Sequence, residues 1–421
     1  MIETKELSPG VTLRCRRDTR FKQGCLSFQF VRRMDDAEAH LNALLPSVML
    51  RATRRHPDLR SICQHLDNLY GVGMGPLVRR VGDYHTVGFY ANFMDDRFAL
   101  EGESVLQGVV EFLEEVLTDS PLQDGGFLPD LVESEKKNLI SAIESAVNNK
   151  SSYIRENLIL SICAPDSFGV PRLGRKEQVA KIQPRELYEH YLKIRRESPL
   201  EIFYVGSADI ARIAAMLQPL LNRWEREVLP VPPQQPLKAG EPVEQIQQMD
   251  VSQGKLCMGF LTDITSRTPG LPAMQVLNAL FGQGMTSKLF RHVREEMSLC
   301  YSISSTYVGS KGILTVSAGI DFDKENLVRQ EIFRQLETCR AGEITEEELH
   351  CAREAVRSSM RGIHDGPGSI EGYYFQTALM QPKLSYDAYM TELDRVTAEQ
   401  VAQAANSLRY HSSWFLKGVE A

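Results

Sequence analysis

Apolar residues in the first half of the chain follow two periodicities, one typical of strands and one typical of helices. Alternation of apolar and polar residues is clear over residues 25–32, and residues 12–17 are rich in strand-forming types, so both stretches predict strands. From about residue 37 to 51 the apolar residues recur at helical spacing instead. They form one face, made of Leu41, Leu44, Leu45, Val48 and Met49. A helix with one buried side is expected there.

The same criteria divide the next part of the chain into helices and strands. Further helices are predicted over 58–70, 100–117, 128–148, 153–161, 184–193 and 210–224, and further strands over 73–80, 84–92 and 200–206. Residues 165–174 are expected to form a loop. The resulting order, β-α-α-β-β-α-α-α, is typical of an α+β fold in which a mostly antiparallel sheet is covered by helices.

A proline-rich stretch lies just past the middle of the chain. Residues 229–242 contain five prolines, which favour a stiff, extended linker rather than a core element. We place this linker at residues 229–248. Its position raises the question of a duplicated chain.

Landmarks on either side of the linker recur at a nearly constant distance. Phe28 and Phe260 lie 232 positions apart, Tyr70 and Tyr301 lie 231 apart, and Gly82 and Gly312 lie 230 apart. These repeats predict two homologous α+β lobes, residues 1–228 and residues 249–421.

Composition restricts the classes of function. The chain has 421 residues and a formal charge of −7, which argues against a nucleic-acid-binding surface. No run of about 18 apolar residues predicts a membrane span, and the N-terminus lacks the apolar segment of a secretory signal. The eight cysteines are scattered without a CxxC pair, so we expect reduced thiols and a cytoplasmic protein.

Candidate chemistry is concentrated in residues 281–301. Gly282 and Gly284 open this segment, and an amphipathic run follows, in which Leu289, Phe290 and Val293 are expected to face a core while Lys288, Arg291, Arg294 and Glu295 face outward. Arg294 and Tyr301 are seven residues apart and would share a face if the helix continued. An arginine fork beside a tyrosine hydroxyl could hold a carbonyl or carboxylate, although a surface arginine and a half-buried tyrosine are the ordinary alternative. A nucleotide loop is excluded because Thr286-Ser-Lys288 has the wrong order.

The segment Gly282-Gln-Gly-Met-Thr-Ser-Lys-Leu-Phe290, continued by Val293-Arg-Glu-Glu and Leu299-Cys-Tyr301, resembles the second-lobe signature of the M16 (pitrilysin-type, M16B) metallopeptidases. The resemblance extends over nearly the whole chain. It implies that Arg294 and Tyr301 contact substrate and that the loop at Gly282 and Gly284 contributes to substrate binding.

Active members of this family hold zinc with a His-x-x-Glu-His helix in the first lobe and a distal glutamate. The matching helix here ends in Leu50-Arg-Ala-Thr53, which places Ala43, Pro46 and Ser47 at the three motif positions and Ala142 at the distal one. Alanine and proline have no side-chain ligand atom, and a neutral serine is a poor zinc ligand. We therefore expect no metal and no catalytic residue in this chain.

The resemblance is to inactive M16 subunits, and closest to the group linked by name to aminopentanol modification of elongation factor P. It implies a heterodimer, in which an HxxEH-bearing M16 paralogue supplies the zinc and this chain binds peptide, with an exposed sheet edge as the place for strand addition. Two alternatives are a structural scaffold derived from a peptidase and an unrelated enzyme that uses His364-Asp-Gly-Pro-Gly368. That last stretch is better explained as a turn.

Overall fold

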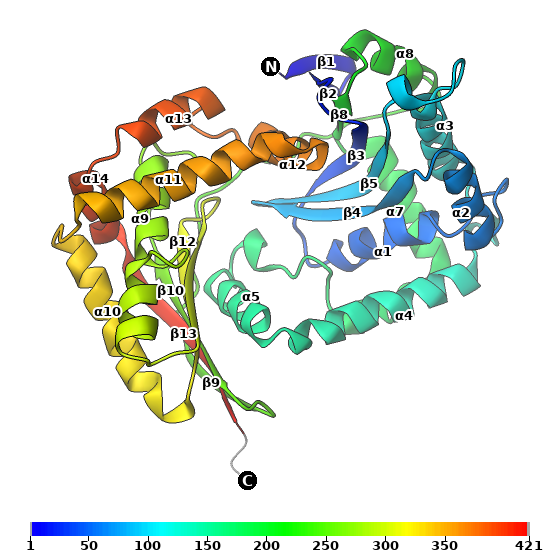
Figure 1. Cartoon of the computed structure of the whole chain (residues 1–421). Helices are drawn as coiled ribbons and strands as arrows, with labels where there is room; N and C mark the ends of the chain where they lie inside the picture. Colours follow the sequence, from blue (N-terminus) through cyan, green and yellow to red (C-terminus); the bar gives the residue numbers. More distant parts are fainter. Residues whose placement is uncertain (1, 419–421) are drawn as a thin grey trace. The chain divides into compact units, whose positions relative to one another are not determined.

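The computed structural model describes residues 2–418 and contains two large sheets, each accompanied by helices (Figure 1). The predicted α+β fold with two lobes is confirmed. The chain forms two compact units. The first consists of residues up to Glu144, Val170–Gln234 and Ile363–Ala378, and the second of Ser145–Gly169, Gln235–Gly362 and the residues from Leu379 onward.

The first unit is built on a six-stranded sheet with one apolar and one polar face. Its strands, in spatial order, are β1 (Glu3–Ser8), β2 (Val11–Arg17), β8 (Leu200–Gly206), β3 (Gln23–Arg33), β5 (Tyr84–Met94) and β4 (Gly73–Val81). In β3 the side chains of Leu26, Phe28 and Phe30 belong to the main core, whereas Ser27 and Gln29 alternate with them and are buried on the other face. The predicted alternation over 25–32 therefore describes a strand that is covered on both faces.

Helices bury the apolar face of this sheet. They are α1 (Ala39–Met49), α2 (Leu59–Asn68), α3 (Val105–Thr118), α4 (Pro129–Ser145), α6 (Lys176–Val179), α7 (Pro184–Glu197) and α8 (Ile210–Leu221), and a small ribbon is formed by β6 (Leu122–Gln123) and β7 (Gly126–Phe127). Local sequence sets their ends. Asp58, for example, accepts a hydrogen bond from the Ser61 backbone N–H and so starts α2 with a capping box.

The second unit is built on a five-stranded sheet. Its strands, in spatial order, are β11 (Ser302–Val308), β12 (Ile313–Ile320), β10 (Gly254–Leu261), β13 (Arg409–Gly418) and β9 (Glu244–Met249). Its helices are α5 (Lys150–Ile162), α9 (Leu271–Phe281), α10 (Glu325–Arg340), α11 (Glu346–Gly362), α13 (Tyr386–Asp394) and α14 (Ala398–Ser407), with a π-helix, η4 (Leu289–Glu296), after α9.

Five strands of the two sheets follow the same order and directions. The order β2-β8-β3-β5-β4 corresponds to β9-β13-β10-β12-β11, with the first pair parallel and every later pair antiparallel in both sheets. This shared topology is what a duplicated chain requires, and it accounts for the repeated spacing of landmarks in the sequence.

The predicted boundaries, 1–228 and 249–421, describe two continuous lobes, whereas each observed unit is made of three separate segments. Residues 145–169 belong to the second unit because α5 is apolar where it meets that sheet. Ile162 lies so close to Gly259 of β10 that a Cβ there would be 2.7 Å from its Cδ1 atom. Without this helix, the outer face of β10 would expose Cys257 to water.

Residues 363–378 belong to the first unit for an electrostatic reason. Helix α12 (Pro367–Met380) carries Glu371, which is fully buried on the polar face of the first sheet. Two nitrogens of Arg79 donate to its carboxylate oxygens at 2.9 and 2.8 Å, and Ser27 Oγ donates at 2.7 Å. A buried carboxylate requires such partners, so this segment is fixed to that sheet.

The predicted linker, residues 229–248, is only partly a linker. Residues 225–243 have no regular structure, but residues 244–248 are part of β9 at the edge of the second sheet. Gln234 is buried, since its amide donates to the Val81 carbonyl and accepts from the Asp83 backbone N–H. Proline content therefore predicted the irregular conformation, whereas the hydrogen bonds of Gln234 fix the part of the segment up to that residue to the first unit.

Candidate functional site

The helix that would carry a zinc motif is α1, and it offers no ligand set. Ala43 and Pro46 are buried in the first core and Ser47 is half-buried. Ala142 is exposed on α4. Within residues 2–418, no three His, Cys, Asp or Glu side chains are grouped so that they could hold a metal ion. The assignment of these four residues to the motif positions remains a prediction.

A buried hydrogen-bonded group lies on the same helix, next to Ala43. Asn42 is fully buried, and its amide nitrogen donates to His85 Nδ1 at 3.1 Å while its oxygen accepts from His190 Nε2 at 2.8 Å. Burial lowers the pKa of His85 to about 3 and that of His190 to about 4, so both rings are neutral at physiological pH. Sequence reasoning missed this group, and the one available signal was an asparagine within an otherwise apolar helix face.

Gly282 and Gly284 have different structural roles in the second unit. Gly282 ends α9, and its carbonyl accepts a hydrogen bond from the Ser305 backbone N–H at 2.9 Å. A Cβ at position 282 would lie 2.6 Å from Ser305 Oγ, so only glycine permits this approach to β11. Gly284 has open space around it but adopts a φ of 98°, which other residues rarely adopt.

The amphipathic run after the loop is a π-helix rather than an α-helix. The Met297 backbone N–H donates to the His292 carbonyl, five residues back. Leu289 and Val293 are buried as predicted, and Phe290 is half-buried. Lys288 was predicted to face outward and does not, because its Nζ forms a 2.9 Å ion pair with Glu348 in a mostly buried position.

The predicted common helical face of Arg294 and Tyr301 is wrong. The π-helix ends at Glu296, and Ser298 has a φ of 51°, which turns the chain before β11 begins. Arg294 stacks on Phe290, with its guanidinium carbon 4.6 Å from the ring centroid. Tyr301 is exposed, and its hydroxyl donates to Asp321 Oδ1 at 2.9 Å. The two functional groups therefore have different immediate partners.

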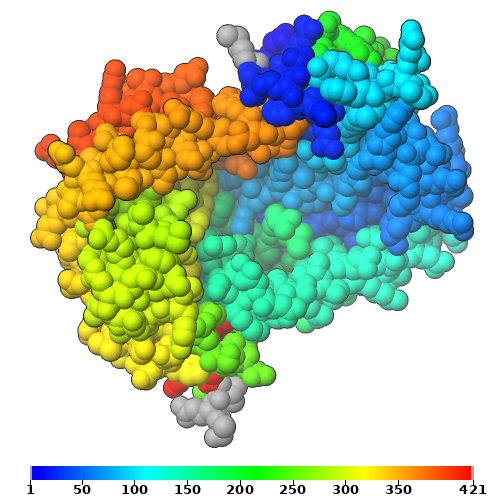
Figure 2. Space-filling view, in the orientation of Figure 1, coloured from blue at the N-terminus to red at the C-terminus, as the bar shows by residue number. Residues whose placement is uncertain are grey.

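The two residues nevertheless lie close to a common neighbour. Burial raises the pKa of Cys300 to about 11, and the charges of Arg294 and Lys324 oppose this rise. Lys324 is also 2.9 Å from Asp321, the partner of Tyr301. The charges of Arg294 and Lys324 therefore both act on Cys300, which directly precedes Tyr301 at the junction of the π-helix and β11. The chain around this junction reaches the surface in the yellow-green part of Figure 2.

A cavity of about 450 Å³ lies beside the glycine loop. It is lined by the end of α9, the loop, strand β11 and helix α11, through Gln275, Asn278, Gln283, Gly284, Ser304, Ser305, Thr306, Tyr307, Val356, Ser359 and Met360. None of these side chains is formally charged. Amides, hydroxyls and a few apolar groups suit the backbone and the uncharged side chains of a peptide.

Strand β11 forms one edge of the second sheet, because β12 is its only neighbour there. On this edge the backbone N–H of Ser305 already has a partner, since it donates a hydrogen bond to the Gly282 carbonyl. An added strand can therefore pair with β11 on either side of Ser305 but not at that residue.

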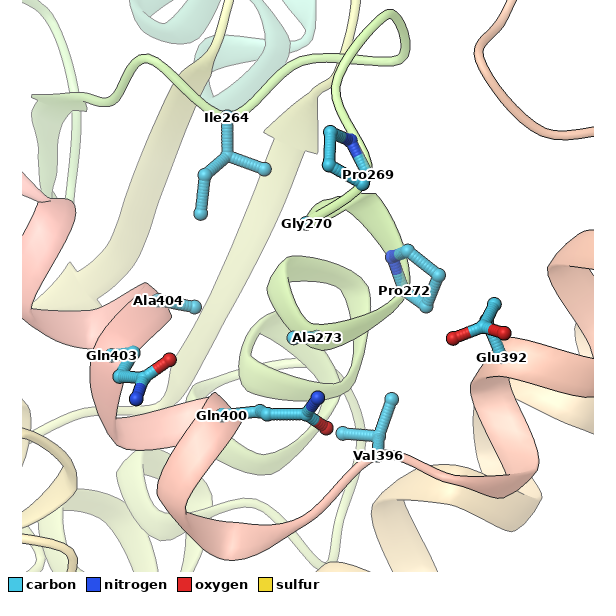
Figure 3. A pocket seen from close by; sticks show the side chains of 10 residues that line it. All are labelled: Ile264, Pro269, Gly270, Pro272, Ala273, Glu392, Val396, Gln400, Gln403 and Ala404. Carbon is cyan, nitrogen blue, oxygen red and sulfur yellow. The ribbon is translucent and has the colours of Figure 1, made fainter.

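A second cavity, of about 350 Å³, lies at the opposite end of α9 (Figure 3). Pro269, Gly270 and Pro272 line it where the helix begins, and Gln400 and Gln403 extend from α14 on the other side. None of the predicted site residues is part of it.

Comparison with known proteins gives a consistent result. The family model described as "Peptidase M16 inactive domain" matches residues 181–356. The "Probable inactive metalloprotease YmfF" of Bacillus subtilis is 27% identical over 418 residues, which cover 99% of this chain and 98% of that protein. This chain is similar to M16-type, metalloprotease-like proteins, and both descriptions call the proteins they name inactive.

Solved structures share the fold of this chain. A conserved protein from Enterococcus faecalis V583 is 26% identical, covers 99% of both chains and has a TM-score of 0.90. A peptidase M16 inactive domain from Pseudomonas fluorescens, 16% identical and covering 100% of this chain and 98% of its own, has a TM-score of 0.80 and shows the same fold. No helix within residues 2–418 is long and apolar enough to cross a membrane. The link to modification of elongation factor P remains a prediction.

Proposed function

We propose that this M16-type chain is a non-catalytic subunit that binds peptide and completes the active-site chamber of a zinc-bearing HxxEH partner. The observation that carries the proposal is the uncharged cavity beside Gly284, which is lined in part by the edge strand β11. An extended peptide needs backbone partners on a sheet edge and room for its side chains. The second unit provides both.

The partner is required by chemistry. Ala43, Pro46 and Ser47 leave α1 without the imidazoles that hold zinc and without the carboxylate that activates water. A chain that binds peptide but lacks these groups contributes to hydrolysis only when another chain supplies them. Arg294 would then stabilise the negative charge that develops on the peptide carbonyl oxygen.

We also propose that the protein works in a reducing compartment, the cytoplasm. None of the eight cysteines, all of which lie within the described residues, forms a disulfide bond, and six of them are buried. Buried thiols outside disulfide bonds are usual where glutathione and thioredoxin keep cysteines reduced.

The experiment is steady-state kinetics on this chain co-expressed with an HxxEH-bearing M16 chain from the same organism. Arg294→Ala and Tyr301→Phe are expected to leave assembly unchanged but to lower kcat/KM for peptide. For Arg294→Ala the loss is expected to be roughly one to three orders of magnitude, the scale of losing one transition-state donor. Arg294→Lys is expected to restore little, since an ammonium lacks the planar fork.

Arg291→Ala is the matched control, because Arg291 is an exposed arginine on the same π-helix. Its kcat/KM is expected to equal that of the parent. Unchanged rates in both Arg294→Ala and Tyr301→Phe, with assembly verified by size-exclusion chromatography, would favour the structural scaffold over the peptide-binding subunit.

A further inference from the structure

The hydroxyl proton of Tyr301 already has an acceptor. Tyr301 Oη donates to Asp321 Oδ1 at 2.9 Å, and a tyrosine has only one O–H. Lys324 Nζ and Tyr301 hold the pKa of the Asp321 carboxyl below its usual value, so the carboxylate is ionised at neutral pH. An ionised carboxylate only accepts hydrogen bonds. The direction of the bond between the two side chains is therefore fixed, with tyrosine as the donor.

Both partners are held in place by the surrounding chain. The Tyr301 backbone N–H donates to the Gly319 carbonyl at 2.8 Å, which anchors the residue at the start of β11. Lys324 Nζ is 2.9 Å from Asp321 Oδ2 and 3.4 Å from the Ser298 carbonyl oxygen. Lys324 therefore joins Asp321 to the turn that precedes Tyr301.

We propose that Tyr301 accepts a hydrogen bond from a peptide N–H, and that Asp321 is the positioning residue that restricts it to this role. The inference rests on the proposed function. The inference gives Tyr301 and Arg294 opposite roles. The guanidinium of Arg294 has only donors, so it binds an acceptor such as a carbonyl oxygen. An extended peptide presents N–H and C=O groups in turn along each edge, so one acceptor and one donor match neighbouring groups of a single strand.

The test uses a fluorescein-labelled decapeptide of Ala, Ser, Thr and Leu, together with nine versions that each replace the N–H of one peptide bond by an ester oxygen. At one position the ester is expected to weaken binding to the parent chain by about threefold to tenfold, the scale of one hydrogen bond. The same ester is expected not to weaken peptide binding to Tyr301→Phe any further. It is also expected to have a smaller effect on Asp321→Ala, in which the hydroxyl is free to rotate and donate.

Asp323→Ala is the matched control. Asp323 lies in η5 (Phe322–Lys324), the short turn that follows Asp321, and its replacement removes one negative charge, as Asp321→Ala does. Asp323→Ala is expected to behave like the parent. A second readout is the titration of Tyr301 by NMR of ¹³Cζ-labelled tyrosine. Its pKa, which the hydrogen bond to Asp321 raises, is expected to fall in Asp321→Ala and to stay raised in Asp323→Ala.

The outcomes separate the two proposals. Failure of the parent chain to bind any decapeptide overturns the proposed function, and this inference with it. If every ester weakens peptide binding to Tyr301→Phe as much as it weakens binding to the parent, the inference alone is overturned. An unchanged Tyr301 titration in Asp321→Ala also overturns it, because Asp321 would then not hold the hydroxyl.

Discussion

Asn42 connects two histidines that are distant in the sequence, His85 on β5 and His190 on α7. All three side chains are buried, and the hydrogen bonds compensate for part of their desolvation. A single polar residue on an apolar helix therefore fixes the relation of that helix to a strand and to another helix. The group lies next to Ala43, the residue that we predict to occupy a position of the zinc motif.

These histidines make the stability of the first unit depend on pH. Their pKa values in the folded state, about 3 and about 4, lie below the ordinary value of 6.5. Below pH 6.5 the unfolded chain therefore binds protons that the folded chain does not, and stability falls as the pH drops toward 4. The slope is on the order of 1.4 kcal/mol per pH unit for each histidine.

His190→Gln keeps an N–H donor for Asn42 and removes one titrating ring. We expect urea unfolding, measured from pH 7 to pH 4, to lose less stability with pH in this variant than in the parent. The charges of Glu38, Arg32 and Lys193 also act on the pKa of His190. The control is His40→Gln, which removes a nearby ring that is less buried and whose pKa burial lowers as well. Identical pH slopes in His190→Gln and the parent would show that the buried ring is not the cause.

At the scale of elements, the connection from α9 to β11 is set by close packing. The carbonyl of Gly282 occupies the N–H of Ser305, and the π-helix then replaces the expected α-helix. Because a π-helix has more residues in each turn than an α-helix, side-chain spacing after the loop does not follow the 3.6-residue rule. Arg294 and Tyr301 do not share a helical face because the π-helix ends at Glu296 and the chain turns at Ser298, before Tyr301 is reached.

The packing predicts the effect of changing Gly282. In Gly282→Ala the new methyl group would lie 2.8 Å from the Ser305 backbone nitrogen, so β11 must move. We expect the free energy of unfolding to fall by about 1–3 kcal/mol, as for other overpacked sites, and peptide affinity to fall with it. Thermal unfolding followed by circular dichroism measures the first effect.

Gly372→Ala is the matched control, because Gly372 lies within α12 and has no atom within 4 Å of the added methyl group. It is expected to be neutral or slightly stabilising, since alanine favours a helix over glycine by up to about 1 kcal/mol. Equal stability of the two alanine variants would contradict the role assigned to the contact at Gly282.

At the scale of the whole molecule, each unit depends on a segment from the other half of the chain. Residues 145–169 complete the second unit, and residues 363–378 complete the first. The two segments occupy corresponding places in the repeat. Helix α5 is the third α-helix after strands β4 and β5, and helix α12 is the third α-helix after strands β11 and β12. The exchange therefore follows the duplication instead of breaking it.

This exchange predicts the behaviour of separated halves. Residues 1–234 alone would leave Arg79 without Glu371, and residues 235–421 alone would leave β10 without α5. We expect neither fragment to unfold cooperatively on its own, and we expect the two co-expressed fragments to assemble into a stable complex. Size-exclusion chromatography and thermal unfolding check both points, and a single fragment with a sharp transition would contradict the prediction.

The sequence alone determined the class of elements, their approximate limits and the duplication, because periodicity and proline content act over a few neighbouring residues. The sequence also predicts that Ala43, Pro46 and Ser47 stand where a zinc motif would be, since a metal site needs particular side chains, and this assignment remains a prediction. Tertiary structure decided which segment completes which unit, where the π-helix ends, and that Asp321 holds Tyr301. These features depend on contacts between residues far apart in the chain. A local pattern shows which face of an element is buried but not which surface covers it.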